Sequence, residues 1–275
     1  MKAATLIGVL LAVGALLLGA LIEGVALAGL IKIPAIVIVL GGTFGATMAA
    51  CGMDGVKAIP VGFKRAFSTP ELDLSGRVRE LVGYAERARK DGMLALESEI
   101  EAIEDPFTRN GLQLVVDGTE PELVREVLDG EIEGMEHRHR AVADPFVKAG
   151  AFSPTIGIIG TVLSLLHVLA NLADPGSIGP AIAGAFVATL LGVGTANVLY
   201  FPVGNRLQKL SAQETAMRTM VLEGILAIQA GDNPRLVMEK LLTFLPPADR
   251  AAAREPADAP ALHAVDDPTP AAAAA

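Results

Sequence analysis

Four long apolar runs, none of which contains a charged residue, dominate the pattern of hydrophobic and polar positions along the chain. They cover Ala3–Ile22, Ile33–Met53, Ala149–Ala173 and Pro175–Gly204. At about 1.5 Å of rise per residue, a helix of each length can cross a hydrocarbon core of about 30 Å, and only helices satisfy their own backbone polar groups there. The pattern therefore predicts an all-α polytopic membrane protein with four transmembrane helices.

The first run is the one that could instead be a secretory signal, because Lys2 precedes an apolar stretch. It is longer than the usual apolar region of a signal peptide, and no small-residue cleavage site with a polar exit follows it. We therefore expect a retained transmembrane helix.

Basic residues beside the runs predict the orientation of the chain in the membrane. They follow the second run, precede the third and follow the fourth, and are Lys57, Lys64, Arg65, Arg138, Arg140, Lys148, Arg206, Lys209 and Arg218. Because Lys and Arg near spans favour the cytoplasmic side, we expect both termini and the long middle segment to be cytoplasmic.

The charged segments between and after the runs have a helical pattern. Transmembrane helices 1 and 2 are expected in residues 1–53, a helical cytoplasmic domain in 54–148 and transmembrane helices 3 and 4 in 149–204. Cytoplasmic C-terminal helices are expected in 205–245. From Pro246 the chain is mostly Ala, Pro and Asp, so residues 246–275 are predicted to be a disordered tail.

Composition supports the membrane assignment and offers little chemistry. The 275 residues are 52% hydrophobic, with a mean hydropathy of +0.49, which is far too apolar for an ordinary soluble protein. The "HRH" at His137–His139 could be read as a metal-ligand pair. Residues two apart on a helix point to different sides, however, so a solvated helix face is expected there instead. We expect no enzyme activity, no metal, no cofactor and no nucleic-acid partner.

Small residues within the runs predict close helix packing. Glycines leave room for a neighbouring helix, and they recur in the second and third runs at Gly41, Gly42, Gly45, Gly157 and Gly160.

Two prolines and two threonines are the other candidate functional residues of the runs. Pro154 and Pro202 lie near the cytoplasmic ends of the third and fourth runs, where each removes a backbone donor and can leave a carbonyl free. Thr161 and Thr189 offer hydroxyls that either replace ion hydration or bond to a carbonyl of their own helix. A membrane carboxylate is absent from the four runs. If ions pass, we expect a partner to supply that carboxylate.

Several segments resemble the MotA family of flagellar stator proteins, including its sodium-driven PomA relatives. They include "PAIVIVLGGTFGAT", "DPFTRNGLQLVVDGTEPELVREVL", "FSPTIGIIGTVLSLLHVLANLADPGSIGPAIAGAFVATLLGVGTANVLYFPVGNRL" and "EGILAIQAGDNPRLVMEKLLTFLPP". The resemblance extends from Ala3 to Pro247 and leaves out the tail.

The resemblance implies a homo-oligomeric ring, a pentamer, in the bacterial inner membrane. The ring would surround the membrane helices of two MotB-type subunits, which carry the ion-binding aspartate and anchor to peptidoglycan. The transported ion would be H+ or Na+, and the ring would push on FliG, the switch protein of the rotor. This implied partner would supply the carboxylate that the four runs lack.

The resemblance also implies roles for individual residues. Pro154 and Pro202 match the prolines beside the partner's aspartate, and Thr161 and Thr189 match hydroxyl positions of the ion path that are tied to sodium selectivity. Arg89 and Glu97, in "ARKDGMLALE", match the charged pair that contacts the rotor. The chain departs from the family pattern at Ala188, where many relatives have threonine, and at Leu191, where they have tyrosine.

Two other functions fit parts of the pattern. An energy-transducing protein of the ExbB or TolQ type resembles the chain around the ion-path helices but typically has three spans. A membrane scaffold without ion coupling would use the glycines and prolines for packing alone.

Overall fold

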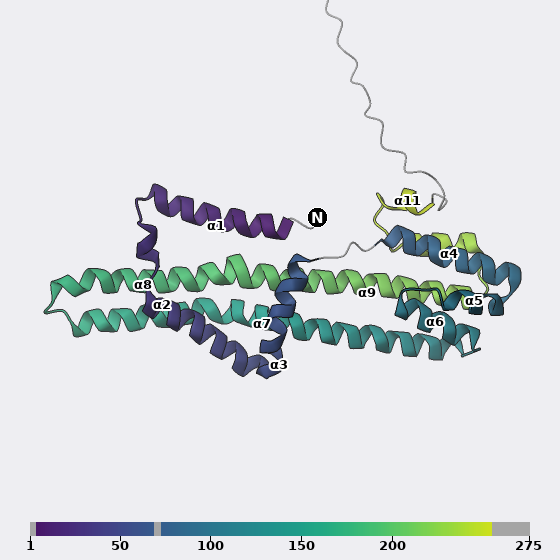
Figure 1. Cartoon of the computed structure of the whole chain (residues 1–275), viewed down its shortest axis with the longest axis horizontal. Coiled ribbons are helices and arrows are strands. Elements are labelled where there is room, and N and C mark those ends of the chain that lie inside the picture. The colour runs from purple at the N-terminus through teal and green to yellow at the C-terminus, as the bar shows by residue number, and fades with distance from the viewer. Residues whose placement is uncertain (1–3, 69–72, 255–275) are drawn as a thin grey trace, which may run out of the picture. The chain divides into compact units, whose positions relative to one another are not determined.

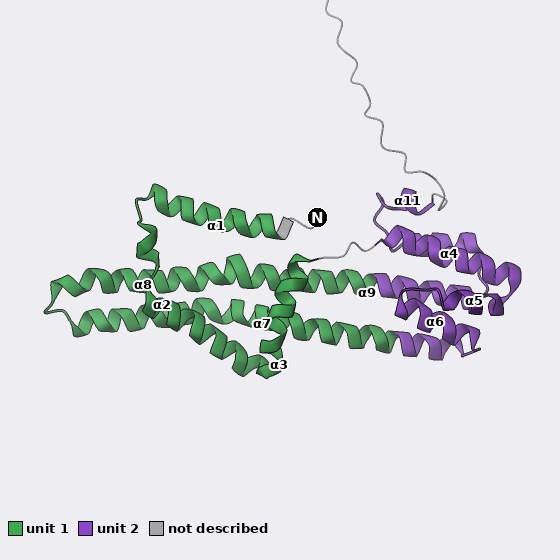
Figure 2. Ribbon diagram, in the orientation of Figure 1, with its two compact units in different colours: residues 1–72, 129–216 green, residues 73–128, 217–275 purple. Residues whose placement is uncertain are grey.

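The computed structural model describes residues 4–68 and 73–254, and every regular element in these ranges is helical. The all-α prediction is thus confirmed for the described chain (Figure 1). The chain divides into two compact units (Figure 2). Unit 1 comprises residues 1–72 and 129–216, and unit 2 comprises residues 73–128 and 217–275.

Unit 1 contains the apolar helices. Three stretches are long and apolar enough to cross a membrane, at Ile33–Phe67, Pro121–Ala170 and Pro175–Gln229, and a shorter apolar helix covers Leu6–Ile22. The elements of unit 1, with the two long helices that continue into unit 2, are α1 (Ala4–Ile22), η1 (Leu27–Leu30), α2 (Ile33–Ile36), η2 (Val37–Gly41), α3 (Gly42–Phe67), α7 (Pro121–Ala170), α8 (Pro175–Thr195), η4 (Ala196–Tyr200) and α9 (Phe201–Gln229).

The three long apolar stretches differ in how regular they are. The first contains the π-helix η2 and a break at Gly52, whose φ of +69° is a conformation that residues with a side chain rarely adopt. The third contains the π-helix η4, immediately before α9. The middle stretch is α7, which continues through Pro145 and Pro154.

The predicted domain boundaries differ from the observed division. The boundaries placed after residues 53, 148 and 204 fall inside α3, α7 and α9. The prediction followed the change from apolar to charged composition, but an α-helix needs no interruption where its surroundings change from lipid to water. The helices therefore continue through each of these points.

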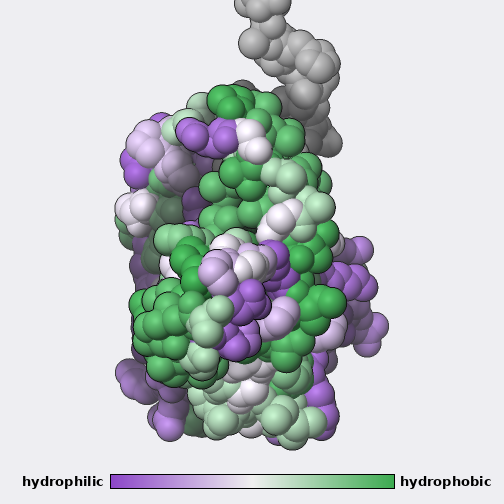
Figure 3. All heavy atoms as spheres, turned by 90° about the vertical axis from the view of Figure 1, so that its left-hand side faces the viewer, coloured by the Kyte–Doolittle hydropathy of each residue, from purple (hydrophilic) through white to green (hydrophobic). Residues whose placement is uncertain are grey.

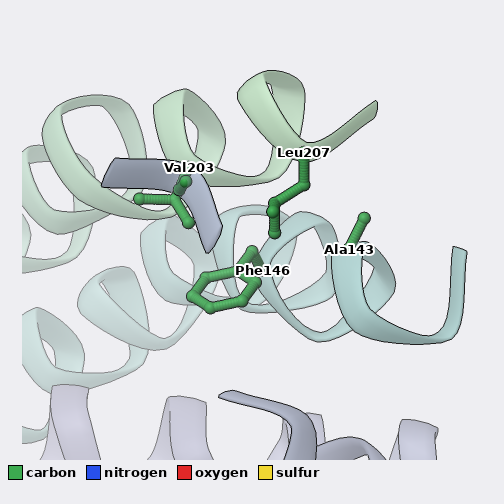
Figure 4. Close-up of a cluster of buried hydrophobic side chains, with 5 residues drawn as sticks. Ala143, Phe146, Val203 and Leu207 are labelled. Atoms are coloured by element: carbon green, nitrogen blue, oxygen red, sulfur yellow. The ribbon is translucent and has the colours of Figure 1, made fainter. Parts of the chain in front are cut away.

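A buried cluster fixes α3, α7 and α9 to one another in unit 1. Phe146 and Ala143 of α7 cluster with Val203 and Leu207 of α9 (Figure 4), and Ala66 of α3 belongs to the same cluster. The ring of Phe63 packs edge-on against that of Phe146, with centroids 5.0 Å apart. Each of the five clustered residues is at least nine-tenths buried, so these three helices share a hydrophobic core.

Large apolar side chains of unit 1 are exposed in the single chain. Ile22, Ile33, Leu169 and Phe186 are each more than half exposed, and Figure 3 shows broad apolar areas around a central polar patch. Exposed apolar surface of this extent is rare in soluble monomers. Lipid or other subunits are expected to cover it.

Unit 2 is a helical domain built on a sharp turn at Gly92. Asp73 caps α4 by accepting a hydrogen bond from the Gly76 N–H, and Gly92 ends the helix with a φ of +88°. Asp105 caps α6 in the same way, through the Thr108 N–H. Besides the ends of α7 and α9, the unit contains α4 (Leu74–Asp91), η3 (Met93–Leu96), α5 (Glu97–Ile100), α6 (Pro106–Val116), α10 (Pro234–Leu242) and α11 (Arg250–Arg254).

The predicted disordered tail is wrong for its first residues. Helix α11 lies within it, and the side chain of Ala253 is fully buried. Composition alone missed this helix because two anchoring side chains, Ser75 and Arg79, belong to a distant helix. The rest of the tail, residues 255–275, lies outside the described residues.

Candidate functional site

The candidate site lies where α7 and α8 approach most closely. A Cβ atom added at Gly157 would lie 2.9 Å from the carbonyl oxygen of Ala188, and one added at Gly192 would lie 2.6 Å from that of Ser153. The Cβ added at Gly192 would also lie 2.9 Å from the Cα of Gly157. The two backbones are therefore in direct contact, which positions the polar side chains above and below this point.

Thr161 and Thr189 lie together on one side of this contact. Their hydroxyl oxygens are within hydrogen-bond distance of each other. The Thr161 hydroxyl also lies 3.1 Å from the carbonyl oxygen of Gly157, in its own helix, and 3.0 Å from that of Ala185, in α8. The structure thus brings together two candidate residues that are 28 positions apart in sequence.

The arrangement contains more acceptors than protons. Two hydroxyls and two carbonyls supply four oxygen atoms, but the hydroxyls have only one proton each. The Thr161 hydroxyl lies within hydrogen-bond distance of a carbonyl of its own helix and also faces oxygens of α8. That the two hydroxyls replace ion hydration stays a prediction. Such a group of neutral oxygens can replace part of a cation's hydration shell.

A second pair of hydroxyls lies on the other side of the glycine contact, and the sequence analysis missed it. The Ser153 and Thr195 hydroxyl oxygens are 2.9 Å apart, and Thr195 also donates to the carbonyl of Leu191 at 2.7 Å. Ser153 is fully buried. Its position one residue before Pro154 in an apolar run is the signal that could have drawn attention to it.

The two candidate prolines lie in packed segments of unit 1. A Cβ added at Gly150, one turn before Pro154, would lie 2.8 Å from the ring of Phe201, the residue before Pro202. Both prolines are half-buried. The structure thereby brings the turn before Pro154 next to the start of α9.

The five glycines expected to pack differ in their surroundings. A Cβ at Gly42 would lie 2.9 Å from Ile156 of α7, and one at Gly160 would lie 3.0 Å from Ala188 of α8. Gly157 makes the backbone contact described above. Gly41 and Gly45 have open space around them within the single chain, so three of the five lie at close helix contacts here.

Arg89 and Glu97 lie on opposite sides of the Gly92 turn in unit 2. Arg89 is in the last turn of α4, Glu97 begins α5, and both side chains are exposed. An ion pair between Arg87 and Glu99 joins the same two segments. The turn therefore holds both candidate charges in one exposed segment.

The "HRH" segment is only partly a solvated face. His137 is exposed as predicted, but His139 is mostly buried against α9. Its Nδ1 is 3.2 Å from the Ser211 hydroxyl and its Nε2 is 3.8 Å from the Glu214 carboxylate. The prediction was wrong for His139 because it did not anticipate that α9 lies alongside α7. In the described residues no three His, Cys, Asp or Glu side chains come together as a metal site.

Comparisons with known proteins agree with these features. The profile of the MotA/TolQ/ExbB proton channel family matches residues 99–220. Motility protein A of Bacillus subtilis is 38% identical over 251 residues, which cover 91% of this chain and 93% of that protein. Motility protein A of Borreliella burgdorferi is 37% identical over 251 residues, covering 91% and 96%.

Two solved structures are similar to the whole described fold. The flagellar MotAB stator complex of Bacillus subtilis matches with a TM-score of 0.84 and 38% identity, covering 92% of this chain and all of that chain. The MotAB structure of C. jejuni matches with a TM-score of 0.84 and 31% identity, covering 90% and 98%.

The fold and the site define an all-helical protein with membrane-spanning helices, in which a tightly packed helix pair presents hydroxyl and carbonyl oxygens. The chain belongs to the MotA/TolQ/ExbB proton channel family, and its similarity to motility protein A extends over nine-tenths of its length.

Proposed function

We propose that the chain is a subunit of a flagellar motor stator, which forms an ion channel with a MotB-type partner and converts proton or sodium motive force into torque. The observation that carries this proposal is the group of oxygens from Thr161, Thr189 and Ala185 at the α7–α8 contact. It occurs in helices whose apolar parts contain no carboxylate. The two similar solved structures, both of MotAB, support the same partner.

The chemistry of the site explains why a partner is needed. An ion that leaves water requires compensation for its lost hydration, and neutral hydroxyl and carbonyl oxygens supply only part of it. A proton additionally needs a titratable carrier. His167 is titratable, but it lies near the end of α7 and not at the Thr161 site, and the Asn171 amide donates to its backbone carbonyl at 2.8 Å. We therefore do not assign it as the carrier. A carboxylate from a MotB-type helix completes the site for either ion.

The assembly follows from the same division of labour. A ring of identical subunits, a pentamer, surrounds the partner helices and covers the exposed apolar residues of unit 1. Four helices cross the bacterial inner membrane and both termini are cytoplasmic, as the basic residues beside the spans favour. Arg89 and Glu97 then face the rotor switch protein FliG.

Ion flux into cells tests the proposal. Cells that express this chain alone are expected to hold cytoplasmic pH and sodium constant under an imposed gradient. Coexpression with a MotB-type partner from the same genome should produce flux, and replacing the partner's membrane aspartate with asparagine should remove it. Flux through the chain alone, or undiminished flux with the asparagine variant, would contradict the proposed division of labour.

A further inference from the structure

Residues 246–254, here named the C-terminal strap, are attached to the N-terminal half of α4. The Ser75 hydroxyl donates to the carbonyl of Asp249 at 3.2 Å, and the Arg79 guanidinium donates to the carbonyl of Ala252 at 2.6 Å. Both acceptors are backbone atoms. Ala252 lies in the short helix α11, whose last carbonyls have no partner within the helix and favour a nearby cation.

The strap is also attached to α10 and the residues that follow it. The Arg254 guanidinium donates to both carboxylate oxygens of Glu239, at 3.0 and 3.1 Å. The Arg250 Nε donates to the carbonyl of Leu245 at 3.1 Å. Between these points the Ala253 side chain is fully buried, and α11 packs against α4. Helices α10 and α4 also pack directly against each other, so the strap adds a second connection between them within unit 2.

The helix that the strap holds is the one that carries Arg89. One face of α4 is already buried against α9. Leu81 of α4 lies so close to Gly224 of α9 that a Cβ added there would be 2.9 Å from it, and 3.4 Å from Leu241 of α10. That contact lies in the middle of α4, and the strap adds attachments nearer its start. A helix fixed at two separated places cannot pivot about either one.

We propose that the C-terminal strap is a positioning element, which fixes α4 and thereby the orientation of the turn that bears Arg89 and Glu97. This inference rests on the proposed function, because that turn is the proposed rotor contact. Arg79 and Ala253 are the positioning residues. The strap reinforces the direct packing of α4 on α10 near the start of α4, and does not itself contact the rotor or the ion.

A pair of matched variants in the full-length protein, coexpressed with its MotB-type partner, tests the proposal. Ala253→Asp introduces a charge at a fully buried position and should release the strap. Ala251→Asp introduces the same charge at an exposed position of the same helix. Three quantities are measured: hydrogen exchange of the α4 amides, swimming speed under viscous load, and partner-dependent ion flux.

We expect Ala253→Asp to speed exchange in the first half of α4 about tenfold, because local opening becomes easier. Speed under load should fall at least twofold, ion flux should stay unchanged, and Ala251→Asp should match the parent protein. Unchanged exchange in Ala253→Asp would show that the strap does not hold α4. Faster exchange with unchanged speed would show that it does not position the rotor contact, and a parallel loss of flux would show a general folding role. Each of these three results overturns the proposal.

A second pair of variants separates positioning from direct contact. Arg254→Glu should reduce speed under load slightly, and adding Glu239→Arg should restore it by re-forming the ion pair with reversed charges. If the double variant did not restore speed under load, Arg254 would act through its own charge and not through its ion pair with Glu239, which would contradict the proposal. The exchange measurement does not depend on the rotor, so it still tests the strap if the proposed rotor contact fails.

Discussion

At the scale of single residues, the helix pair depends on the missing side chain of Gly192. A methyl group there would lie 2.6 Å from the Ser153 carbonyl oxygen, and neither backbone can yield without moving its helix. We expect Gly192→Ala to cost about 1–3 kcal/mol of stability, as overpacking typically does. Thermal unfolding of the purified protein in detergent measures this loss.

Gly194→Ala is the matched control, because a Cβ at Gly194 meets nothing within 4 Å. It should unfold like the parent protein. Equal unfolding temperatures for the two variants would show that the α7–α8 contact is looser than the structure describes.

The hydroxyl of Thr189 can be removed without changing the shape of the side chain. Thr189→Val leaves Thr161 without its hydroxyl partner across the helix pair. We expect partner-dependent ion flux to fall about tenfold, equivalent to one lost hydrogen-bond-sized interaction of about 1.4 kcal/mol. Membrane levels should be unchanged. Thr155→Val, at an exposed position of α7, should leave flux intact, and an equal effect of both variants would remove Thr189 from the ion path.

Only part of this residue-scale picture could be predicted from the sequence. Thr161 and Thr189 stood out as hydroxyls in apolar runs. Their pairing, and the carbonyl of Ala185 beside them, depend on the register of α7 against α8, which the Gly157–Gly192 contact sets. Sequence reasoning paired Gly157 with Gly160 on one helix and did not consider Gly192 on the other.

At the scale of elements, the π-helix η4 and Pro202 form one feature. A proline at position 202 cannot donate to the carbonyl four residues earlier, that of Val198. We expect Pro202→Ala to restore this donor and tighten the turn at η4, since π-bulges and prolines both disturb the helical ladder. Torque, measured as the speed of tethered cells, should fall severely while membrane insertion and assembly persist.

Pro180→Ala is the control for Pro202→Ala. Pro180 lies inside α8 near its start and is exposed. Normal torque with Pro202→Ala would reduce both the proline and η4 to packing features.

Glu223 of α9 links three helices of unit 2. It accepts a hydrogen bond from Lys240 of α10 at 2.7 Å and one from Arg125 of α7 at 2.8 Å, and these partners lower the pKa of the Glu223 carboxyl. A lowered folded-state pKa stabilises the protein above the unfolded pKa of about 4.3, and this contribution disappears as pH falls through the folded-state value.

Glu223→Gln should therefore lower the unfolding temperature at neutral pH. Because Lys240 and Arg125 are both partly exposed, we expect a loss of only about 1 kcal/mol. The difference from the parent protein should start to shrink as the pH falls below the unfolded pKa of about 4.3, and it should vanish only below the lowered folded-state pKa. Thermal unfolding of the purified protein between neutral and acidic pH checks this, and a difference that persists unchanged in acid would contradict the assigned pKa shift.

Sequence patterns predicted the apolar elements better than the small ones. The break at Gly92 has a local signal, because a glycine readily adopts the positive φ that ends α4. The start of α10 also has one, the capping side chain of Asn233. Helix α11 has no such signal. Its order comes from Ser75 and Arg79, more than 170 positions away.

At the scale of the whole molecule, force is expected to leave through the exposed turn at Gly92. Arg89 is exposed, so a single pair with the rotor contributes about 0–1 kcal/mol. Arg89→Gln should lower torque slightly, whereas Arg89→Glu adds repulsion and should impair swimming strongly. Partner-dependent ion flux should remain normal in both variants.

Two further variants sharpen this prediction. A compensating charge reversal in the rotor switch protein should restore some movement to Arg89→Glu. Lys90→Glu, an exposed neighbour on another side of α4, should have a smaller effect. Loss of ion flux in Arg89→Glu, or normal swimming with both Arg89→Glu and Glu97→Lys, would exclude the rotor contact.

The division of the molecule into units was the least predictable property. Charge and hydropathy divide the chain by its surroundings, whereas α7 and α9 each contribute residues to both compact units. Compactness depends on which side chains pack together, such as Phe146 with Val203, and that pairing is not visible in a hydropathy pattern.

The contact between Gly157 and Gly192 also limits how such a protein can evolve. Neither glycine can be replaced alone without separating the helices, so substitutions at these two positions cannot accumulate one at a time during evolution. Ala188 lies beside this contact, where it faces Gly160 and is itself fully buried. An alanine codon becomes a threonine codon by one nucleotide change. A third hydroxyl beside Thr161 and Thr189 is therefore one mutation away, but the larger side chain must fit a fully buried position, so we expect it to need a compensating change in a neighbouring helix.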